Sequence, residues 1–199
     1  MSKDKKIKMH SSTIVLLAIA LLVGIIVLDV AYQKAWRTHE KIIEATASAD
    51  VFAKVDSTTF DGSSFTKDDI KKSNITMINV WETTCPACLG EMGELEELSK
   101  IYPEADFQLV GVCADVFESG GTQLKQDQID KGKELMQNAG VTFPTVIPTP
   151  EMYAFFRTTI AGFPTTYFVD SEGNIIRTVA GARKLDAWKS IIEEVMEGQ

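Results

Sequence analysis

Apolar and polar positions follow two different kinds of pattern in the two parts of this chain. The first part contains an apolar run, SSTIVLLAIALLVGIIVLDVAY, which covers residues 11–32 with Asp29 as its only charged residue. As a helix this run is about 33 Å long, enough to cross the roughly 30 Å hydrocarbon core of a bilayer. Because it is apolar on every face, it does not resemble an amphipathic core helix. The pattern therefore predicts one N-terminal transmembrane helix.

The charged residues beside this run predict its orientation. Four lysines precede it between residues 3 and 8, whereas the basic residues after it are partly offset by Glu40 and Glu44. The positive-inside rule then places the N-terminus in the cytoplasm and the rest of the chain outside the cell membrane. We expect a cytoplasmic tail (1–10), a signal anchor (11–32), a stalk (33–50) and an extracytoplasmic domain (51–199). Cleavage near Ala47-Ser48-Ala49 is the alternative, although that site lies well beyond the apolar run.

From residue 50 onward, short buried-strand patterns alternate with helical ones. Strands are predicted at 75–81, 107–114, 165–170 and 174–180, and helices at 86–102, 122–139 and 185–197. The Ser-Glu-Gly segment predicts a hairpin turn between the last two strands. The stretch TFPTVIPTPEMYAFF, within residues 115–160, predicts an additional strand, turn and short helix. This order predicts an α/β fold, in which a mixed sheet is covered by helices on both faces.

Charge excludes one class of partner. Residues 50–199 hold 13 Lys/Arg and 24 Asp/Glu, a net charge of −11. Phosphate backbones require a basic surface, so we expect no nucleic-acid partner. Nothing in this part reads as a repeat or a low-complexity tract.

The three cysteines carry the candidate chemistry. Cys85 and Cys88 stand three positions apart, and residues 50–199 contain no histidine, which leaves too few ligands for a structural zinc site. A disulfide across so short a loop removes little unfolded-chain entropy, so a purely structural role is also disfavoured. Pro86 suits the first position of a helix, which places Cys85 at the N-cap, where the helix dipole favours a thiolate. We predict a redox-active pair, with Cys85 as nucleophile and Cys88 as resolving thiol.

The segment INVWETTCPACLGEMGEL (78–95), together with AGFPTTYFVD (161–170), resembles thioredoxin-fold proteins of the TlpA/ResA/CcmG type. These are membrane-anchored thiol–disulfide oxidoreductases that act outside the cytoplasm. The resemblance implies a thioredoxin-like domain with a cis peptide bond at Pro164, facing the cysteines. It also implies a substrate groove and a glutamate, Glu91, that accepts the proton of Cys88. The residues assigned to the groove are Phe163, Thr165, Trp81 and Pro86.

The resemblance also implies substrates and partners. We expect a reductase of disulfides in exported proteins, such as apocytochrome c, that serves cytochrome c maturation and is itself reduced by a membrane electron donor of the CcdA/DsbD kind. Neither a nucleotide nor a metal cofactor is expected. Alternatives on the same fold are a disulfide oxidase or isomerase and a thiol peroxidase. Outside enzymes, the alternatives are a metal or haem chaperone and an acidic docking module.

Several residues depart from the family pattern or stay open. Thr84 stands where thioredoxin-like proteins usually carry tryptophan, Glu82 occupies a usually small position, and Gly93 replaces a helix-kinking proline. In a peroxidase, the position of Glu82 would be a threonine. Cys113, at the end of the strand 107–114, is either a buried thiol that packs as a small apolar residue or a third redox cysteine.

Overall fold

The computed structural model describes residues 22–34, 51–118, 121 and 123–198. The chain divides into two units, Met1–Thr46 and Ala47–Gln199. In the first unit, residues 22–34 form a helix with exposed side chains. No helix among the described residues is both long enough and apolar enough for a membrane span. Residues 1–10, 11–21 of the predicted anchor, and 35–50 of the predicted stalk lie outside the described part.

The second unit has the alternating order that the sequence predicts. Its elements are β1 (Asp56–Thr58), β2 (Ser64–Thr66), α2 (Lys67–Ile70), β3 (Ile75–Trp81), α3 (Pro86–Leu98), β4 (Phe107–Cys113), α4 (Gln126–Asn138), β5 (Thr145–Val146), α5 (Pro150–Thr159), β6 (Thr165–Asp170), β7 (Ile175–Ala180) and α6 (Leu185–Glu197).

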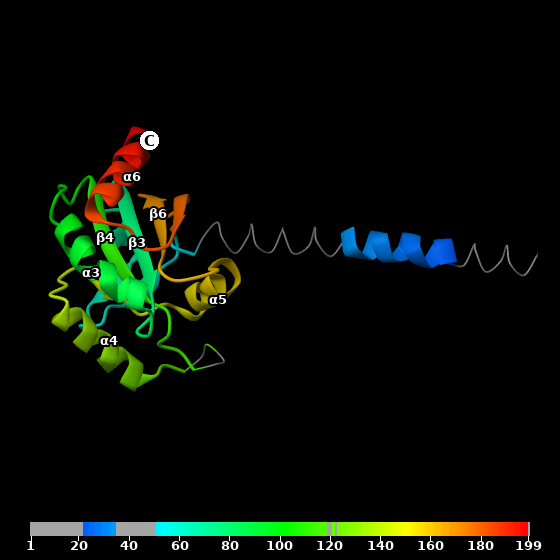
Figure 1. Ribbon diagram of the computed structural model, residues 1–199, viewed down its shortest axis with the longest axis horizontal. Helices are drawn as coiled ribbons and strands as arrows, with labels where there is room; N and C mark the ends of the chain where they lie inside the picture. Colours follow the sequence, from blue (N-terminus) through cyan, green and yellow to red (C-terminus); the bar gives the residue numbers. More distant parts are fainter. Residues whose placement is uncertain (1–21, 35–50, 119–120, 122, 199) are drawn as a thin grey trace, which may run out of the picture. The chain divides into compact units, whose positions relative to one another are not determined.

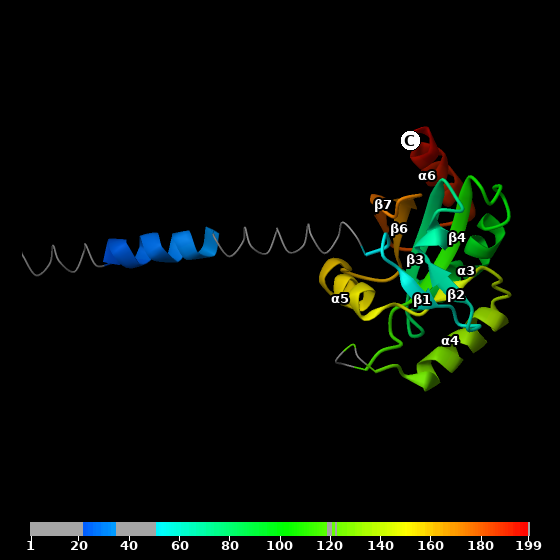
Figure 2. The same ribbon diagram turned by 180° about the vertical axis from the view of Figure 1, so that it is seen from behind.

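Five of these strands form one mixed sheet, in the order β5-β4-β3-β6-β7 (Figures 1 and 2). β3 runs parallel to β4, and β4 runs parallel to β5, while β6 is antiparallel to both β3 and β7. β1 and β2 form a separate antiparallel pair. The predicted mixed α/β sheet is therefore confirmed.

Alternate side chains of the central strand β3 belong to two separate cores. Met77 and Trp81 pack in a cluster with residues of α3, α4 and α6, whereas Ile78 and Val80 pack in a cluster with residues of α2 and α5. Because successive side chains of a strand point to opposite faces, helices cover the sheet on both sides. All seven residues of β3 are accordingly buried, including the polar Thr76 and Asn79.

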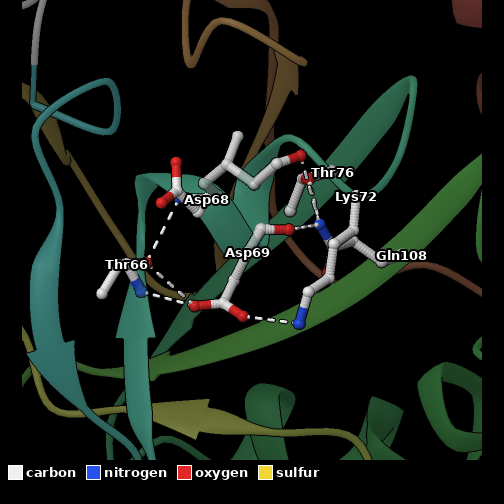
Figure 3. Close-up of polar contacts among 7 residues, drawn as sticks. Thr66, Asp68, Asp69, Lys72, Thr76 and Gln108 are labelled. Carbon is white, nitrogen blue, oxygen red and sulfur yellow. Dashed lines mark hydrogen bonds and ion pairs between the residues drawn. The ribbon is translucent and has the colours of Figure 1, made fainter.

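The short helix α2 is held against the sheet by polar contacts (Figure 3). Thr66 and Asp69 form a capping box at its start, with the Thr66 N–H donating to Asp69 Oδ2 at 2.7 Å. The Gln108 side chain, on β4, donates both to the Asp69 carbonyl and to Thr76 Oγ1 on β3, each at 2.8 Å. These contacts place Ile70 in the core on this face.

Some element boundaries differ from the prediction. The helix that begins at Pro86 ends at Leu98 rather than near residue 102, because the N–H groups of Lys100 and Ile101 bond carbonyls three residues back and tighten the last turn. The additional strand in 115–160 is only the two residues of β5. The helix after it, α5, begins at Pro150, with Thr149 as N-cap.

Candidate active site

The two neighbouring cysteines lie at the start of α3, directly after the loop that leaves β3. Cys85 is the N-cap residue, with an extended backbone, and Pro86 is the first residue of the helix. The Cys88 N–H donates to Cys85 Sγ at 3.2 Å. The two sulfurs form a disulfide, and the Cα atoms are 5.3 Å apart. In the reduced protein, the unpaired N–H groups and the helix dipole at this end favour a thiolate on Cys85.

The two cysteines differ in exposure. Cys88 is 1% exposed and belongs to the core beneath α3, whereas Cys85 is only partly buried. The neighbouring Thr84 and Pro86 are exposed. An incoming disulfide therefore meets Cys85 first, and Cys88 can attack only a partner that is already attached to Cys85.

Asp115 holds the loop that leads into Cys85. Both of its carboxylate oxygens accept from the Thr83 N–H at 3.1 Å, and Oδ2 also accepts from Thr83 Oγ1 at 2.7 Å. The Gln128 amide, on α4, donates to the same oxygen at 3.1 Å. Asp115 was not among the predicted site residues. The signal was present, because the parallel strands β3 and β4 end at one edge of the sheet, so residues just after β4 lie beside the loop that follows β3.

The predicted cis-proline lies at the same edge of the sheet. The Phe163–Pro164 bond is cis, as the sequence resemblance implies. Thr165 pairs with Val80, near the end of β3. Pro164 therefore lies near the point where β3 ends and the cysteine loop begins. The Pro164 carbonyl accepts from the Gly181 N–H at 2.8 Å, which ties this segment to the start of the following loop.

Two of the residues assigned to the groove do not line an open surface. Trp81 is 2% exposed and packs in the core with residues of α3, α4 and α6. Thr165 is 4% exposed, and its hydroxyl donates to the Gly162 carbonyl at 2.8 Å. Both side chains point into the packed interior because of the alternation along β3 and β6. Phe163 is half-buried and Pro86 is exposed, so these two side chains remain accessible.

Glu91, one turn after Cys88 on α3, is a buried carboxylate with defined partners. It is 2% exposed. Its Oε1 accepts from Asn79 Nδ2 at 3.0 Å, and its Oε2 accepts from the Arg183 backbone N–H at 2.9 Å. The Asn79 amide also donates to Thr166 Oγ1 at 3.1 Å. The surrounding glutamates of α3 gave no sign of this difference in the sequence, because burial depends on the sheet beneath the helix.

The environment of Glu91 suits proton transfer. Burial raises the pKa of this carboxyl, while the hydrogen bonds from Arg183 and Asn79 lower it in part. A raised pKa moves a carboxyl toward neutral pH, where a general base is most effective. Asn79, Thr166 and Arg183 were not predicted as site residues. Asn79 and Arg183 contact Glu91, and Thr166 contacts Asn79, only through the tertiary fold.

Cys113 is separated from the exchange chemistry by burial. It is 0% exposed, and it lies opposite Trp81 in the pairing of β3 with β4. Burial raises the pKa of its thiol well above the ordinary value, and the nearby Asp115 charge adds to this effect. Its Sγ lies 3.2 Å from Asp115 Oδ1 and donates to it. These observations favour a protonated, inert thiol.

Comparison with known proteins gives a family match over most of the domain. Residues 48–178 match the model of the AhpC/TSA family. The thiol-disulfide oxidoreductase ResA of Oceanobacillus iheyensis is 30% identical over 126 residues, which cover 62% of this chain and 58% of that protein. The chain therefore spans less than two thirds of this relative.

Two further proteins show the same similarity. The thiol:disulfide interchange protein HelX of Rhodobacter capsulatus is 25% identical over 134 residues, 67% of this chain and 68% of that protein. Among solved structures, a thiol:disulfide interchange protein of the thioredoxin family from Chlorobium tepidum superposes with a TM-score of 0.58. Its identity is 24%, and the superposition covers 71% of this chain and 92% of that one. The domain has a thioredoxin-like fold.

Proposed function

The chain belongs to the AhpC/TSA family, and from this premise we propose that it is a thiol–disulfide reductase of exported proteins. The observation that carries the proposal is the Cys85–Cys88 disulfide, at the start of α3. One of its sulfurs belongs to a partly exposed residue and the other to a buried one. Because of this difference, we assign Cys85 as the nucleophile that attacks the substrate disulfide and Cys88 as the thiol that resolves the mixed disulfide.

The reaction consists of two exchanges. In the reduced protein, the Cys85 thiolate attacks one sulfur of the substrate disulfide, which breaks the substrate S–S bond and forms a mixed disulfide. The released substrate sulfur leaves as a thiolate. Cys88 then loses its proton and attacks Cys85 Sγ, which releases the second substrate thiolate and forms the Cys85–Cys88 disulfide. Two electrons pass to the substrate, which takes up two protons.

Glu91 is the group that accepts the Cys88 proton in this scheme. It lies on the same helix one turn later, and its buried carboxyl has a raised pKa. Asn79 and the Arg183 N–H hold its two oxygens, so the carboxyl is oriented before the reaction begins. We assign Asn79 a positioning role for this reason.

The cis peptide segment receives the substrate chain. Among the described residues, neither the N–H nor the C=O of Phe163 takes part in a backbone hydrogen bond. An extended substrate segment can pair with these free groups, as peptides pair with exposed sheet edges in other complexes. Its disulfide would then lie over Cys85, at the same edge of the sheet.

The proposed location rests on the sequence pattern, and the proposed partners rest on the family resemblance. The apolar run of residues 11–32 is the proposed signal anchor, and the lysines before it support an orientation with the tail inside and the domain outside the cell membrane. The proposed substrates are exported proteins with disulfides, apocytochrome c among them. The proposed electron donor is a membrane protein of the CcdA/DsbD kind, because the oxidised pair must be reduced again on the outer side.

The equilibrium reduction potential of the full-length chain tests this function. The protein, in detergent, is equilibrated with mixtures of reduced and oxidised dithiothreitol or glutathione, and free thiols are then alkylated and counted by mass spectrometry. A potential at or below about −230 mV supports the reductase. A potential near −120 mV, which is typical of a strong oxidant, would assign the opposite direction of electron flow. A pair that does not interconvert reversibly would refute the redox function.

A further inference from the structure

A cavity lies beside the cysteine loop and has no part in the exchange chemistry described above. Its volume is about 370 Å³, and Glu82 and Phe163 are among the residues that line it. Glu82 is three residues before Cys85, and its carbonyl accepts from the Cys85 N–H at 3.2 Å. Phe163 immediately precedes the cis-proline. The cavity therefore adjoins both segments that the substrate chain is expected to touch.

Much of the wall of this cavity is aromatic and comes from the segment that the sequence left without a partner. α5, drawn in yellow and ochre in Figure 1, contributes Tyr153 and Phe156, and the loop after β4 contributes Phe117. The rings of Phe117 and Tyr153 are 5.0 Å apart. The Arg157 guanidinium lies 5.9 Å from the centre of the Tyr153 ring. These ring faces accept both an aliphatic chain and a positive charge.

Two carboxylates line the same cavity. Asp115 is occupied by Thr83 and Gln128, so it acts as a fixed negative charge. Glu82 is half-buried, and in the described part of the chain its side chain has no hydrogen bond or ion pair. Burial, and then the charge of Asp115, raise the pKa of Glu82. An incoming cation would favour the charged form of Glu82 and so oppose this rise in pKa.

Two cations also line the cavity, so the charges of its lining alone do not determine the charge of the preferred ligand. Arg157 is exposed and lies over Tyr153, and Lys125 is at the start of α4. The electrostatic field of the whole domain favours a positive ligand, because residues 50–199 carry a net charge of −11. A positive side chain is attracted by that field at a distance and by Glu82 at contact.

We propose that this cavity is a specificity subsite that takes a lysine or arginine side chain of the disulfide-bearing substrate. The alkyl stem lies along the aromatic wall, and the charged end meets Glu82, with Asp115 behind it. The inference rests on the proposed function, because it assigns a preference to the substrate of the Cys85–Cys88 pair. It makes Glu82 a residue that determines specificity.

The test compares three synthetic peptides that contain one intramolecular disulfide and differ only in the residue beside it, which is lysine, glutamine or glutamate. The full-length chain, reduced and in detergent, is mixed with each peptide, and the rate constant of exchange is measured by quenched flow. We expect the lysine peptide to react about fivefold faster than the glutamine peptide at low salt. The ratio should fall as the salt concentration rises, because salt screens the charges.

Substitutions of Glu82 provide the second part of this test. The ratio of the lysine rate to the glutamine rate should approach one in Glu82→Gln and fall below one in Glu82→Lys. Glu172→Gln is the matched control, because it removes the same charge from an exposed turn at the opposite end of the sheet. It should keep the wild-type ratio. Because each ratio is taken within one variant, a general change in activity does not affect it.

The neutral reagent bis(2-hydroxyethyl) disulfide separates the two proposals. If the wild-type chain reduces neither this reagent nor any peptide, the proposed function itself fails. If it reduces the reagent but treats the lysine and glutamine peptides alike, the subsite is refuted and the function stands. A preference for the glutamate peptide would also overturn the subsite, and it would assign the cavity to anionic side chains through Lys125 and Arg157.

Discussion

Replacing Glu91 with glutamine removes the proposed proton acceptor of Cys88 and keeps the shape of the side chain. The wild-type carboxylate is 2% exposed and accepts from Asn79 Nδ2 at 3.0 Å and from the Arg183 N–H at 2.9 Å. Glutamine offers one oxygen and one NH₂ group to these two donors. One donor therefore loses its acceptor, and an unpaired buried donor costs about 1–3 kcal/mol.

A second effect of this substitution has the opposite sign and depends on pH. Because burial raises the Glu91 pKa above 4.5, the native state binds more protons than the unfolded state between the ordinary pKa and the raised one. The wild-type free energy of unfolding must then fall as pH rises through that window. Glutamine does not titrate. The stability of Glu91→Gln relative to wild type should therefore improve as the pH rises above the ordinary glutamate pKa and through the raised one, as urea denaturation at a series of pH values would show.

Turnover should respond much more strongly than stability. A positioned general base is worth about 10²-fold to 10⁴-fold, so resolution of the mixed disulfide should slow by about 100-fold near neutral pH. The reduced full-length chain is mixed with a peptide disulfide, quenched with acid at intervals and analysed by mass spectrometry. A species with the peptide attached to Cys85 should accumulate in the variant.

Glu97→Gln is the matched control for these measurements, because Glu97 is exposed on the same helix. It should resolve the mixed disulfide at the wild-type rate and show no comparable pH-dependent gain in stability. If Glu91→Gln resolves the mixed disulfide as fast as Glu97→Gln does, the proton-transfer role of Glu91 is wrong. If Glu97→Gln also resolves the mixed disulfide slowly, the effect comes from the charge of the helix as a whole.

Further substitutions test other parts of the site. Cys88→Ser should trap a peptide on Cys85, whereas Cys85→Ser should trap almost none, because Cys88 is 1% exposed; equal adduct yields by mass spectrometry would contradict the assignment. Asp115→Ala should lower the free energy of unfolding by about 2 kcal/mol in urea, because the Thr83 N–H loses its acceptor. A loss no larger than that of Asp68→Ala, at an exposed position, would show that water replaces the carboxylate. Cys113→Ala should leave the exchange rate and the reduction potential unchanged, since the thiol is 0% exposed, and a changed potential would give Cys113 a redox role.

Much of the fold and of the cysteine chemistry was accessible from the sequence. The strand at 75–81 and the helix at 185–197 have the predicted ends, because their patterns are long and bounded by clear breaks. Cys85 lies at the N-cap before Pro86, as the local preferences of proline and of helix starts predict. The cis bond at Pro164 followed from the resemblance of AGFPTTYFVD to a known segment, because no local pattern distinguishes a cis-proline from a trans one.

Residues that act through contacts across the sheet were missed or misplaced. Trp81 and Thr165 were assigned to the groove but are 2% and 4% exposed, since the face to which a strand residue points depends on what covers each side. The residues next to Asp115 and Asn79 in the chain do not indicate their roles, because their partners lie 32 and 12 positions away. For Asp115 the only signal was the predicted strand order. Glu91 and Glu97 are similar in the sequence, yet one is buried and the other exposed.

The sequence by itself determined the apolar N-terminal run, the order of strands and helices, and the position of a cysteine pair at a helix start. These features depend on periodicity and on residues within a few positions of one another. Only the tertiary structure decided which carboxylate is buried beside the pair, which acid holds the cysteine loop, and where α5 encloses a cavity. Those properties arise because the parallel strands β3 and β4 end at the same edge of the sheet and bring distant segments together there. The burial of each side chain and its contacts, rather than its residue type alone, then determine what it can do.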